Sequence, residues 1–247
     1  MKGRIVLVTG ASRGIGAATA KLLAANGASV AVNYFQNETA AHAVVGEIRQ
    51  TGGTAIAVRA DVRNEAEVHT MVSEVEKLLG PVDTLVSNAS IGFPAKPFTE
   101  FLWEEFEAKL TGELKSAFFS CKAVVPGMIH RGTGCIIAVS SILSRHSSPG
   151  FIAHSTAKSG LDAFIRSLAT ELGPLGIRAN VVAPGLTLTD ATAWLPEEQK
   201  AMVAKMTPLQ HVATPEDIAG VVLALASNHN RFLTGCYIPA SGGTLML

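Results

Sequence analysis

Short β-branched runs alternate with longer stretches of helical periodicity along the whole chain, and this alternation limits the fold more than any other feature. The runs are short and almost wholly apolar, which is typical of strands buried on both faces. Right-handed strand–helix–strand crossovers then give a seven-stranded parallel sheet with helices on both faces. No linker, repeat or low-complexity segment interrupts the pattern, so residues 1–247 are predicted to form a single doubly wound α/β domain. The strands are predicted at 4–9, 29–33, 54–60, 84–87, 135–139, 176–183 and 236–239, and the helices at 17–26, 38–50, 65–79, 103–129, 154–172 and 215–226.

A loop with three glycines follows the first predicted strand and leads into the first predicted helix. Glycine permits the tight turn and lets the backbone approach a ligand, while the N–H groups of the new helix face an anion. This position at the start of an α/β chain is that of the dinucleotide-binding fingerprint, so the domain is expected to be of the Rossmann type. The candidate cofactor residues of the loop are Gly10, Ser12, Arg13, Gly14, Ile15 and Gly16.

Composition excludes several function classes. The chain has 20 Lys+Arg and 20 Asp+Glu, so a net charge of zero removes the electrostatic case for a nucleic-acid or acidic-membrane partner. Its apolar runs are too short for a signal peptide or a membrane span, which predicts a soluble, cytoplasmic protein. The 3 cysteines are far apart and the histidines have no ligand spacing, so neither a disulfide framework nor a metal site is expected.

The glycine spacing, T-G-x-x-x-G-x-G over residues 9–16, resembles the cofactor loop of the short-chain dehydrogenase/reductase family. Further family motifs follow in order to the C-terminus, and within the family the chain is most similar to 3-oxoacyl-carrier-protein reductases. The resemblance implies a homo-oligomer, a tetramer or a dimer, built on the long central helices. It also implies further cofactor residues, which are Asp61 and Val62 at the adenine, Asn88 and Ala89 beside the cofactor, and Pro184, Gly185, Thr187 and Thr189 at the nicotinamide carboxamide.

The end of the second predicted strand indicates which nicotinamide cofactor is bound. A carboxylate there would bind the ribose 2′-hydroxyl and repel a 2′-phosphate, but this chain has Asn33 and no acid until Glu38. Arg13 in the glycine loop can form a planar, charge-assisted pair with a phosphate. NADP(H) is therefore expected in preference to NAD(H).

The resemblance also locates a catalytic group, and here the chain departs from the family. The family uses a serine, a Y-x-x-x-K pair and an asparagine; Ser141 and Lys158 match, but His154 stands at the tyrosine position. His154 and Lys158 are i and i+4, so both lie on one helix face. The asparagine position falls on Glu113. With only 2 tyrosines, neither of them near this motif, the chain offers no replacement for the missing phenol.

Three functions remain open for this altered site. In the first, which we favour, an NADPH-dependent enzyme reduces a ketone or 3-oxoacyl carbonyl to an alcohol. Ser141 positions the carbonyl oxygen, His154 donates the proton and Lys158 anchors the ribose. In the second, the protein binds NADP(H) without reductase activity, and in the third His154 serves isomerase, lyase or cyclase chemistry.

The protonation of His154 depends on its neighbours. The reference pKa of a histidine, about 6.5, suits proton transfer near neutrality. Lys158 would lower that pKa, whereas Glu113, if close, would raise it and could form a His–Glu pair. Alternatively, Glu113 is an ordinary surface acid on the long helix.

Residues 186–207 resemble the mobile substrate lid of the family, where specificity for a small carbonyl substrate, free or carrier-bound, would be set. This segment carries Trp194 and Leu195 between polar residues. Alternatively, it is an exposed helix whose Trp194 packs on a partner subunit.

Overall fold

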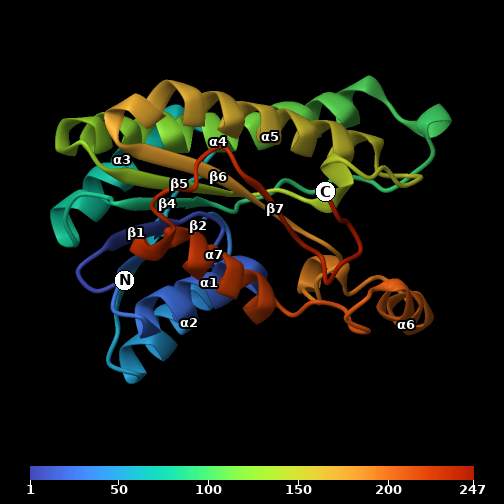
Figure 1. The fold of residues 1–247 in the computed structure, drawn as a ribbon, viewed down its shortest axis with the longest axis horizontal. Helices are drawn as coiled ribbons and strands as arrows, with labels where there is room; N and C mark the ends of the chain where they lie inside the picture. Colours follow the sequence, from blue (N-terminus) through green and yellow to red (C-terminus); the bar gives the residue numbers. More distant parts are fainter.

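The computed structural model describes all residues, 1–247, and confirms the predicted α/β fold. Its seven strands form one parallel sheet in the order β3-β2-β1-β4-β5-β6-β7, which is a doubly wound, Rossmann-type arrangement (Figure 1). The observed strands are β1 (Ile5–Val8), β2 (Ser29–Tyr34), β3 (Thr54–Arg59), β4 (Thr84–Ser87), β5 (Gly134–Val139), β6 (Ile177–Pro184) and β7 (Tyr237–Ala240).

Helices cover both faces of the sheet (Figure 1). One face carries α1 (Gly14–Ala25), α2 (Glu38–Gln50) and α7 (Pro215–Ala226), and the other carries α3 (Glu65–Leu78), α4 (Trp103–Arg131) and α5 (Ile152–Leu172). Successive side chains of a strand point to opposite faces, so Val6 and Val8 enter one hydrophobic core while Leu7 enters the other. This arrangement explains why the strands read as continuous apolar runs rather than alternating ones.

Helix ends differ from the predicted ones where local geometry decides them. Helix α4 runs to Arg131, two residues beyond the expected end, because Gly132 at φ 64° supplies the left-handed residue that ends it. Helix α5 starts at Ile152 and not at His154, which puts His154 in its first turn. The segment 186–207 contains a helix of its own, α6 (Glu197–Met206), that the sequence analysis left as one of two alternatives.

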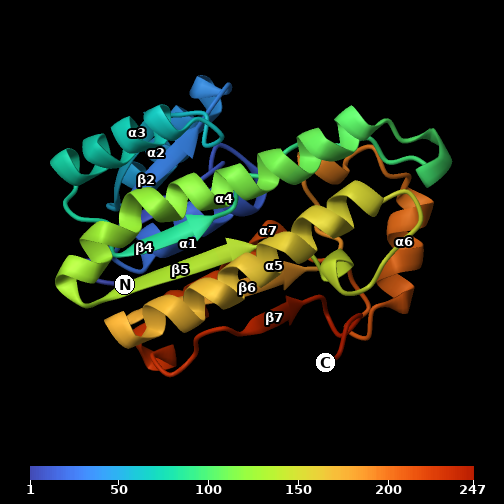
Figure 2. The same cartoon turned by 90° about the horizontal axis from the view of Figure 1, so that it is seen from above.

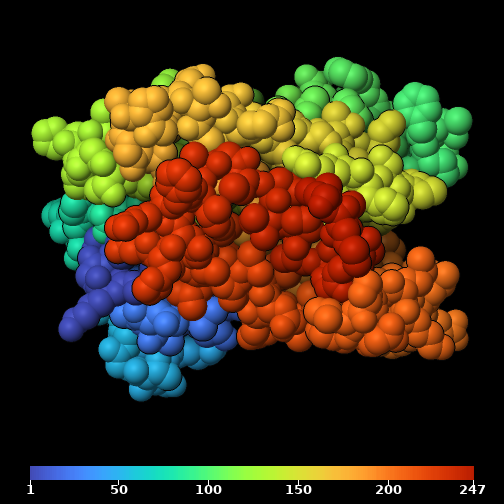
Figure 3. All heavy atoms as spheres, in the orientation of Figure 1, coloured from blue at the N-terminus to red at the C-terminus, as the bar shows by residue number.

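The carboxyl ends of the strands lie at one edge of the sheet, and the sheet order changes direction between β1 and β4. Figure 2 shows the loops after β4 and β5 together with α6 at this end of the molecule. In the space-filling view, the orange segment around α6 forms a lobe at one corner, beside the red C-terminal residues (Figure 3). No helix is both long enough and apolar enough to span a membrane.

Candidate active site

The glycine loop after β1 has a shape that only glycine permits. Gly10 and Gly14 have positive φ angles, 61° and 54°. A Cβ atom on Gly16 would lie 2.6 Å from both the Asn88 side-chain nitrogen and the Gly10 carbonyl oxygen. The three glycines therefore let the loop fold back tightly against the loop after β4.

Helix α1 begins in this loop with its N-terminus uncapped by a side chain. Arg13 is the N-cap and makes no capping hydrogen bond, and no acidic residue lies in the first turn. The first N–H groups and the positive end of the helix dipole therefore remain available to an anion. Ser12 and Ile15 are half-buried in the same loop, while the Arg13 side chain is exposed.

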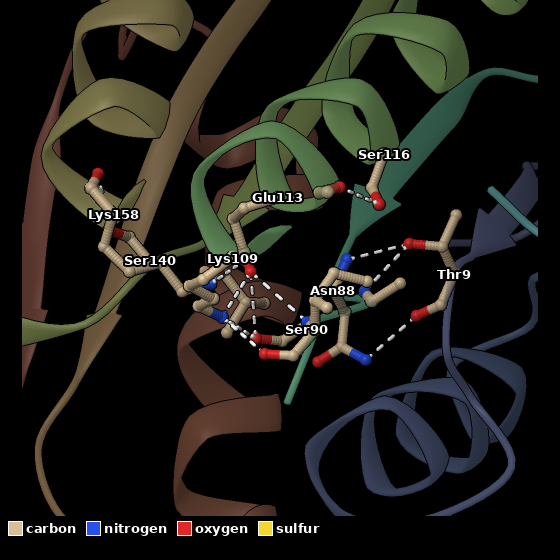
Figure 4. A network of polar contacts seen from close by, with 12 residues as sticks. Thr9, Asn88, Ser90, Lys109, Glu113, Ser116, Ser140 and Lys158 are labelled. Carbon is tan, nitrogen blue, oxygen red and sulfur yellow. Dashed lines mark hydrogen bonds and ion pairs between the residues drawn. The ribbon is translucent and has the colours of Figure 1, made fainter. Parts of the chain in front are cut away.

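Two of the predicted cofactor residues, Asn33 and Asn88, hold the glycine loop in place with side-chain hydrogen bonds to its backbone. The Asn33 side chain accepts a hydrogen bond from the Gly10 N–H at 3.1 Å and donates to the Ala60 carbonyl at 3.2 Å. The Asn88 amide donates to the Thr9 carbonyl at 2.9 Å, and the Thr9 hydroxyl accepts from the Asn88 and Ala89 N–H groups (Figure 4). The side chains of Asn33 and Asn88 thus fix the loop, and Thr9 has a role that the sequence analysis did not assign.

The residues predicted at the adenine lie beyond β3. Asp61 is held by Arg63 through both carboxylate oxygens, and this hydrogen bonding lowers the pKa of Asp61 below its usual range. Val62 is buried. The guanidinium groups of Arg59 and Arg63 lie 5.6 Å and 5.7 Å from the centre of the Phe35 ring, so positive charge gathers at this edge.

The residues predicted at the carboxamide follow β6 and reach the glycine loop. Pro184 ends β6, Gly185 donates its N–H to the Ala240 carbonyl, and Thr187 is buried. The Thr189 methyl lies 3.4 Å from a Cβ atom built on Gly14. The stretch therefore lies against the glycine loop, and its contact with a carboxamide stays a prediction.

The predicted catalytic residues come from three elements. Ser141 follows β5 and is half-buried, and its hydroxyl accepts a hydrogen bond from the Leu143 N–H at 3.2 Å. Lys158 on α5 is buried, and its ammonium donates to the Val139 carbonyl at 2.8 Å. It also lies 2.6 Å from Oε1 of Glu113 on α4. The structure thus places Glu113 beside Lys158, and the alternative of a surface acid is wrong because Glu113 is 2% exposed.

Glu113 has a second buried partner, Lys109, which the sequence analysis missed. The Lys109 ammonium lies 2.6 Å from Oε2 of Glu113 and also donates to the Ser90 hydroxyl and the Ile91 carbonyl (Figure 4). Burial alone would raise the pKa of Glu113, but Lys158 and Lys109 outweigh it and lower that pKa to about 2. A doubly held carboxylate is the result.

His154 stands one helical turn from Lys158 without touching Glu113. Its ring stacks on Phe93 with centroids 4.8 Å apart, and its Nδ1 atom is buried without a hydrogen-bond partner. Burial, together with the positive charges of Lys158 and Lys109, lowers the pKa of His154 to about 3, with Glu113 opposing the shift. The His154–Glu113 pair that the sequence left open is not formed; the two oxygens of Glu113 face Lys158 and Lys109 instead.

Comparisons with known proteins agree with this set of motifs. A family profile described as enoyl-(acyl carrier protein) reductase matches residues 10–244. The chain is 38% identical over 247 residues to a 3-oxoacyl-[acyl-carrier-protein] reductase of Synechocystis sp., with 100% of this chain and 98% of that protein covered. It is 36% identical over 240 residues to a protein of the same description from Staphylococcus epidermidis, with coverage of 97% and 98%. An uncharacterized oxidoreductase of Methylorubrum extorquens is 39% identical over 249 residues, with 98% of each chain covered.

The chain belongs to the short-chain dehydrogenase/reductase family. This membership makes it an oxidoreductase by family. The Y-x-x-x-K motif of short-chain dehydrogenase/reductases falls on His154 and Lys158, and the family asparagine position falls on Glu113. Ser141 and Lys158 keep the residue types of the family motif, whereas His154 and Glu113 do not, and a catalytic role for these four residues stays a prediction.

The 2 tyrosines of this short-chain dehydrogenase/reductase do not take the place of the family phenol. Tyr34 is buried at the end of β2, beside His42. The Tyr237 hydroxyl comes closer than the sequence analysis expected, because it donates to the backbone carbonyl of Ser141 at 3.2 Å. The Tyr237 hydroxyl contacts the backbone of Ser141 and not its hydroxyl, so it stabilises the loop that follows β5.

Proposed function

We propose that this protein reduces a ketone or 3-oxoacyl carbonyl to an alcohol with NADPH, and that Ser141, His154 and Lys158 are its catalytic residues. The observation that carries the proposal is the position of Lys158, whose ammonium contacts the last residue of β5 just before Ser141, with His154 one helical turn earlier on α5. The carboxyl ends of β5 and of β1, where the glycine loop begins, lie at the same edge of the parallel sheet. The printed descriptions of the relatives from Synechocystis sp. and Staphylococcus epidermidis support the substrate class.

The residues present fit a nicotinamide dinucleotide. The uncapped start of α1 suits a pyrophosphate. A Cβ on Gly10 would lie 2.8 Å from the Ala89 Cα, so glycine is needed there for the loop to keep the shape that leads into this helix end. The buried amide of Asn33 replaces the carboxylate that would repel a 2′-phosphate, and exposed Arg13 supplies a cation. These features favour NADP(H) over NAD(H). When bound, the cofactor supplies the hydride.

Lys158 is suited to anchor the cofactor ribose. An ammonium has three N–H donors, and two of those of Lys158 are engaged by the Val139 carbonyl and by Glu113. One donor is left for a ribose hydroxyl. Because Lys158 is held by two partners, its remaining N–H has a fixed direction before any ligand binds.

His154 acts in this proposal as a neutral acid. With a pKa of about 3, only about one His154 in ten thousand carries an extra proton at pH 7. Since the buried Nδ1 has no partner, the single proton of the neutral ring is assigned to Nε2, which donates a hydrogen bond to the carbonyl oxygen. As hydride adds to the carbonyl carbon, the π electron pair moves to oxygen, and this oxygen takes the Nε2 proton.

The surroundings of His154 favour that proton transfer. The imidazolate left behind lies near the ammonium groups of Lys158 and Lys109 and in the first turn of α5, where the helix dipole stabilises negative charge. The ring regains its proton from water. A neutral histidine polarising a carbonyl is a known enzymatic pattern. The same charges that lower the pKa of the imidazolium therefore help the neutral ring to donate.

The test is NADPH consumption with a panel of ketones and 3-oxoacyl thioesters, with cofactor binding measured separately by calorimetry. The parent is expected to turn over and His154→Ala to lose at least about a hundredfold in kcat while it still binds NADPH. An unchanged rate in His154→Ala would refute the role of the imidazole. Binding of NADPH without turnover of any carbonyl would instead support the second candidate, a dinucleotide-binding protein without reductase activity. The absence of a tyrosine at position 154 favours this candidate.

A further inference from the structure

Lys109 is a buried cation with no part in the reaction described above. Its side chain is 0% exposed, and it is the largest fully buried side chain in the protein. Lys109 and Glu113 are i and i+4 on α4, on the stripe of that helix that faces the interior. A lysine is almost never fully buried unless it is paired, so this position calls for an explanation.

Lys109 and Lys158 differ in how many of their N–H donors are already used inside the protein. Lys109 uses all three of its N–H donors inside the protein, on Glu113 Oε2, the Ser90 hydroxyl and the Ile91 carbonyl. Lys158 uses two and keeps one. Lys109 is therefore closed to ligands, whereas Lys158 is open to one.

Glu113 links the two lysines through different oxygens. Oε1 faces Lys158, and Oε2 accepts from Lys109, from the Ser90 hydroxyl and, at 3.3 Å, from the Ile91 N–H. The three contacts to Oε2 fix the rotation of the carboxylate, which keeps Oε1 on Lys158.

We propose that Lys109 is a positioning residue, which holds the Glu113 carboxylate on Lys158 and away from His154 and thereby keeps His154 neutral. This inference rests on the proposed function only where it concerns catalysis, because a neutral His154 matters for turnover only if His154 is the acid. The placement of the charges is a property of the protein without ligands.

The charged groups that face His154 come from two helices. Lys109 and Glu113 lie on α4, and Lys158 lies on α5. The loop after β4 contributes the uncharged Phe93, whose ring stacks on His154 and whose ring centre lies 5.2 Å from the Lys109 ammonium. Removing the charge of Lys109 takes away one group that lowers the pKa of His154. It also removes the shortest of the three hydrogen bonds that hold Oε2 of Glu113, the one group that raises this pKa, so the carboxylate is held less firmly in place. Both changes favour protonation of His154.

The experiment is an NMR titration of the full chain with ¹⁵N-labelled histidine, in which the His154 signals are assigned by their loss in His154→Gln. In the parent, His154 is expected to stay neutral down to pH 4.5. Lys109→Met should give His154 a clearly protonated fraction at pH 4.5, with a midpoint between about 4.5 and 6.5. Lys109→Gln keeps an N–H donor for Glu113 but loses the charge, so a smaller protonated fraction is expected.

The matched control is Lys122→Met, which removes an exposed lysine of the same helix that pairs with Glu65. It should leave the His154 signals unchanged. Circular dichroism establishes whether each variant is folded. If Lys109→Met does not fold, the protonated fraction of His154 in Lys109→Gln alone tests the proposal. His154 fully neutral at pH 4.5 in the folded Lys109 variants would overturn the proposal. The titration needs neither cofactor nor substrate, so a failure of the proposed reductase activity would be seen separately, as a lack of NADPH turnover.

Discussion

The two ends of the site handle charge in opposite ways. At the glycine loop, the groups available to a ligand are backbone N–H donors and an exposed guanidinium, and the bracing side chains Asn33 and Asn88 are neutral. Between α4 and α5, three charged side chains, Lys109, Glu113 and Lys158, are almost completely buried together. The first end depends on backbone shape, whereas the second depends on one carboxylate that pairs with two ammonium groups. Substitutions should therefore fail for different reasons at each end.

The buried charges should show the largest effect. Glu113→Gln leaves two ammonium groups without their carboxylate, and removing one partner of a buried ion pair costs about 3–5 kcal/mol of unfolding free energy. The control Glu47→Gln breaks an exposed pair with Lys21 and should cost at most about 1 kcal/mol. Urea unfolding of the variants measures both; similar losses in the two would show that burial of the Glu113 network adds nothing.

The glycine loop should fail through shape. In Gly16→Ala, the added methyl lies 2.6 Å from the Asn88 amide and the Gly10 carbonyl, so the loop must shift, at a cost of about 1–3 kcal/mol, and should lose most of its affinity for NADPH. The matched control is Gly46→Ala in α2, where nothing lies within 4 Å of the new methyl. That variant should gain about 0.5–1 kcal/mol and bind normally. Calorimetry measures the affinity of both variants for NADPH. Unchanged NADPH binding in Gly16→Ala would contradict the role of the loop shape in cofactor binding.

The cofactor preference should show the smallest effect, because it depends on an exposed side chain. Arg13 also lies 3.6 Å from Asp190, so in the structure its guanidinium is already near one anion. Arg13→Ala is expected to weaken NADPH binding about tenfold and to leave NADH binding almost unchanged. Equal losses for the two cofactors would mean that Arg13 does not contact a 2′-phosphate.

The same contrast decides how much could be predicted from the sequence. The glycine loop is local in the chain, so its residues and its place between β1 and α1 are evident from spacing. The catalytic cluster joins helices α4 and α5, and a side-chain contact between helices leaves no local pattern. Glu113 and Lys158 were both found through the family motif, but their pairing and the second partner, Lys109, were not. The His154–Glu113 pair that the sequence left open is not formed.

Helical periodicity does hold a signal for Lys109. Positions 109, 113, 116, 117 and 120 of α4 are all buried, which is the spacing of one helix face. Lys109 lies on that face four residues before Glu113, so the i, i+4 pair was visible in the sequence. What was not visible is that the face packs on α5, because the facing residues of α4 are small or polar where a core helix usually carries large apolar ones.

The proposed reaction depends most of all on His154 as a neutral acid. The most direct test is the pH dependence of kcat for carbonyl reduction at saturating NADPH, measured between pH 5 and 8 with His154→Ala as the baseline. An imidazolium acid loses its proton as the pH rises, so its rate would fall about tenfold per pH unit above its pKa. With the pKa of His154 lowered to about 3, the ring is already neutral throughout this range. We therefore predict a rate that does not fall between pH 6 and 8, and a tenfold fall per pH unit above pH 6.5 would contradict the role of neutral His154.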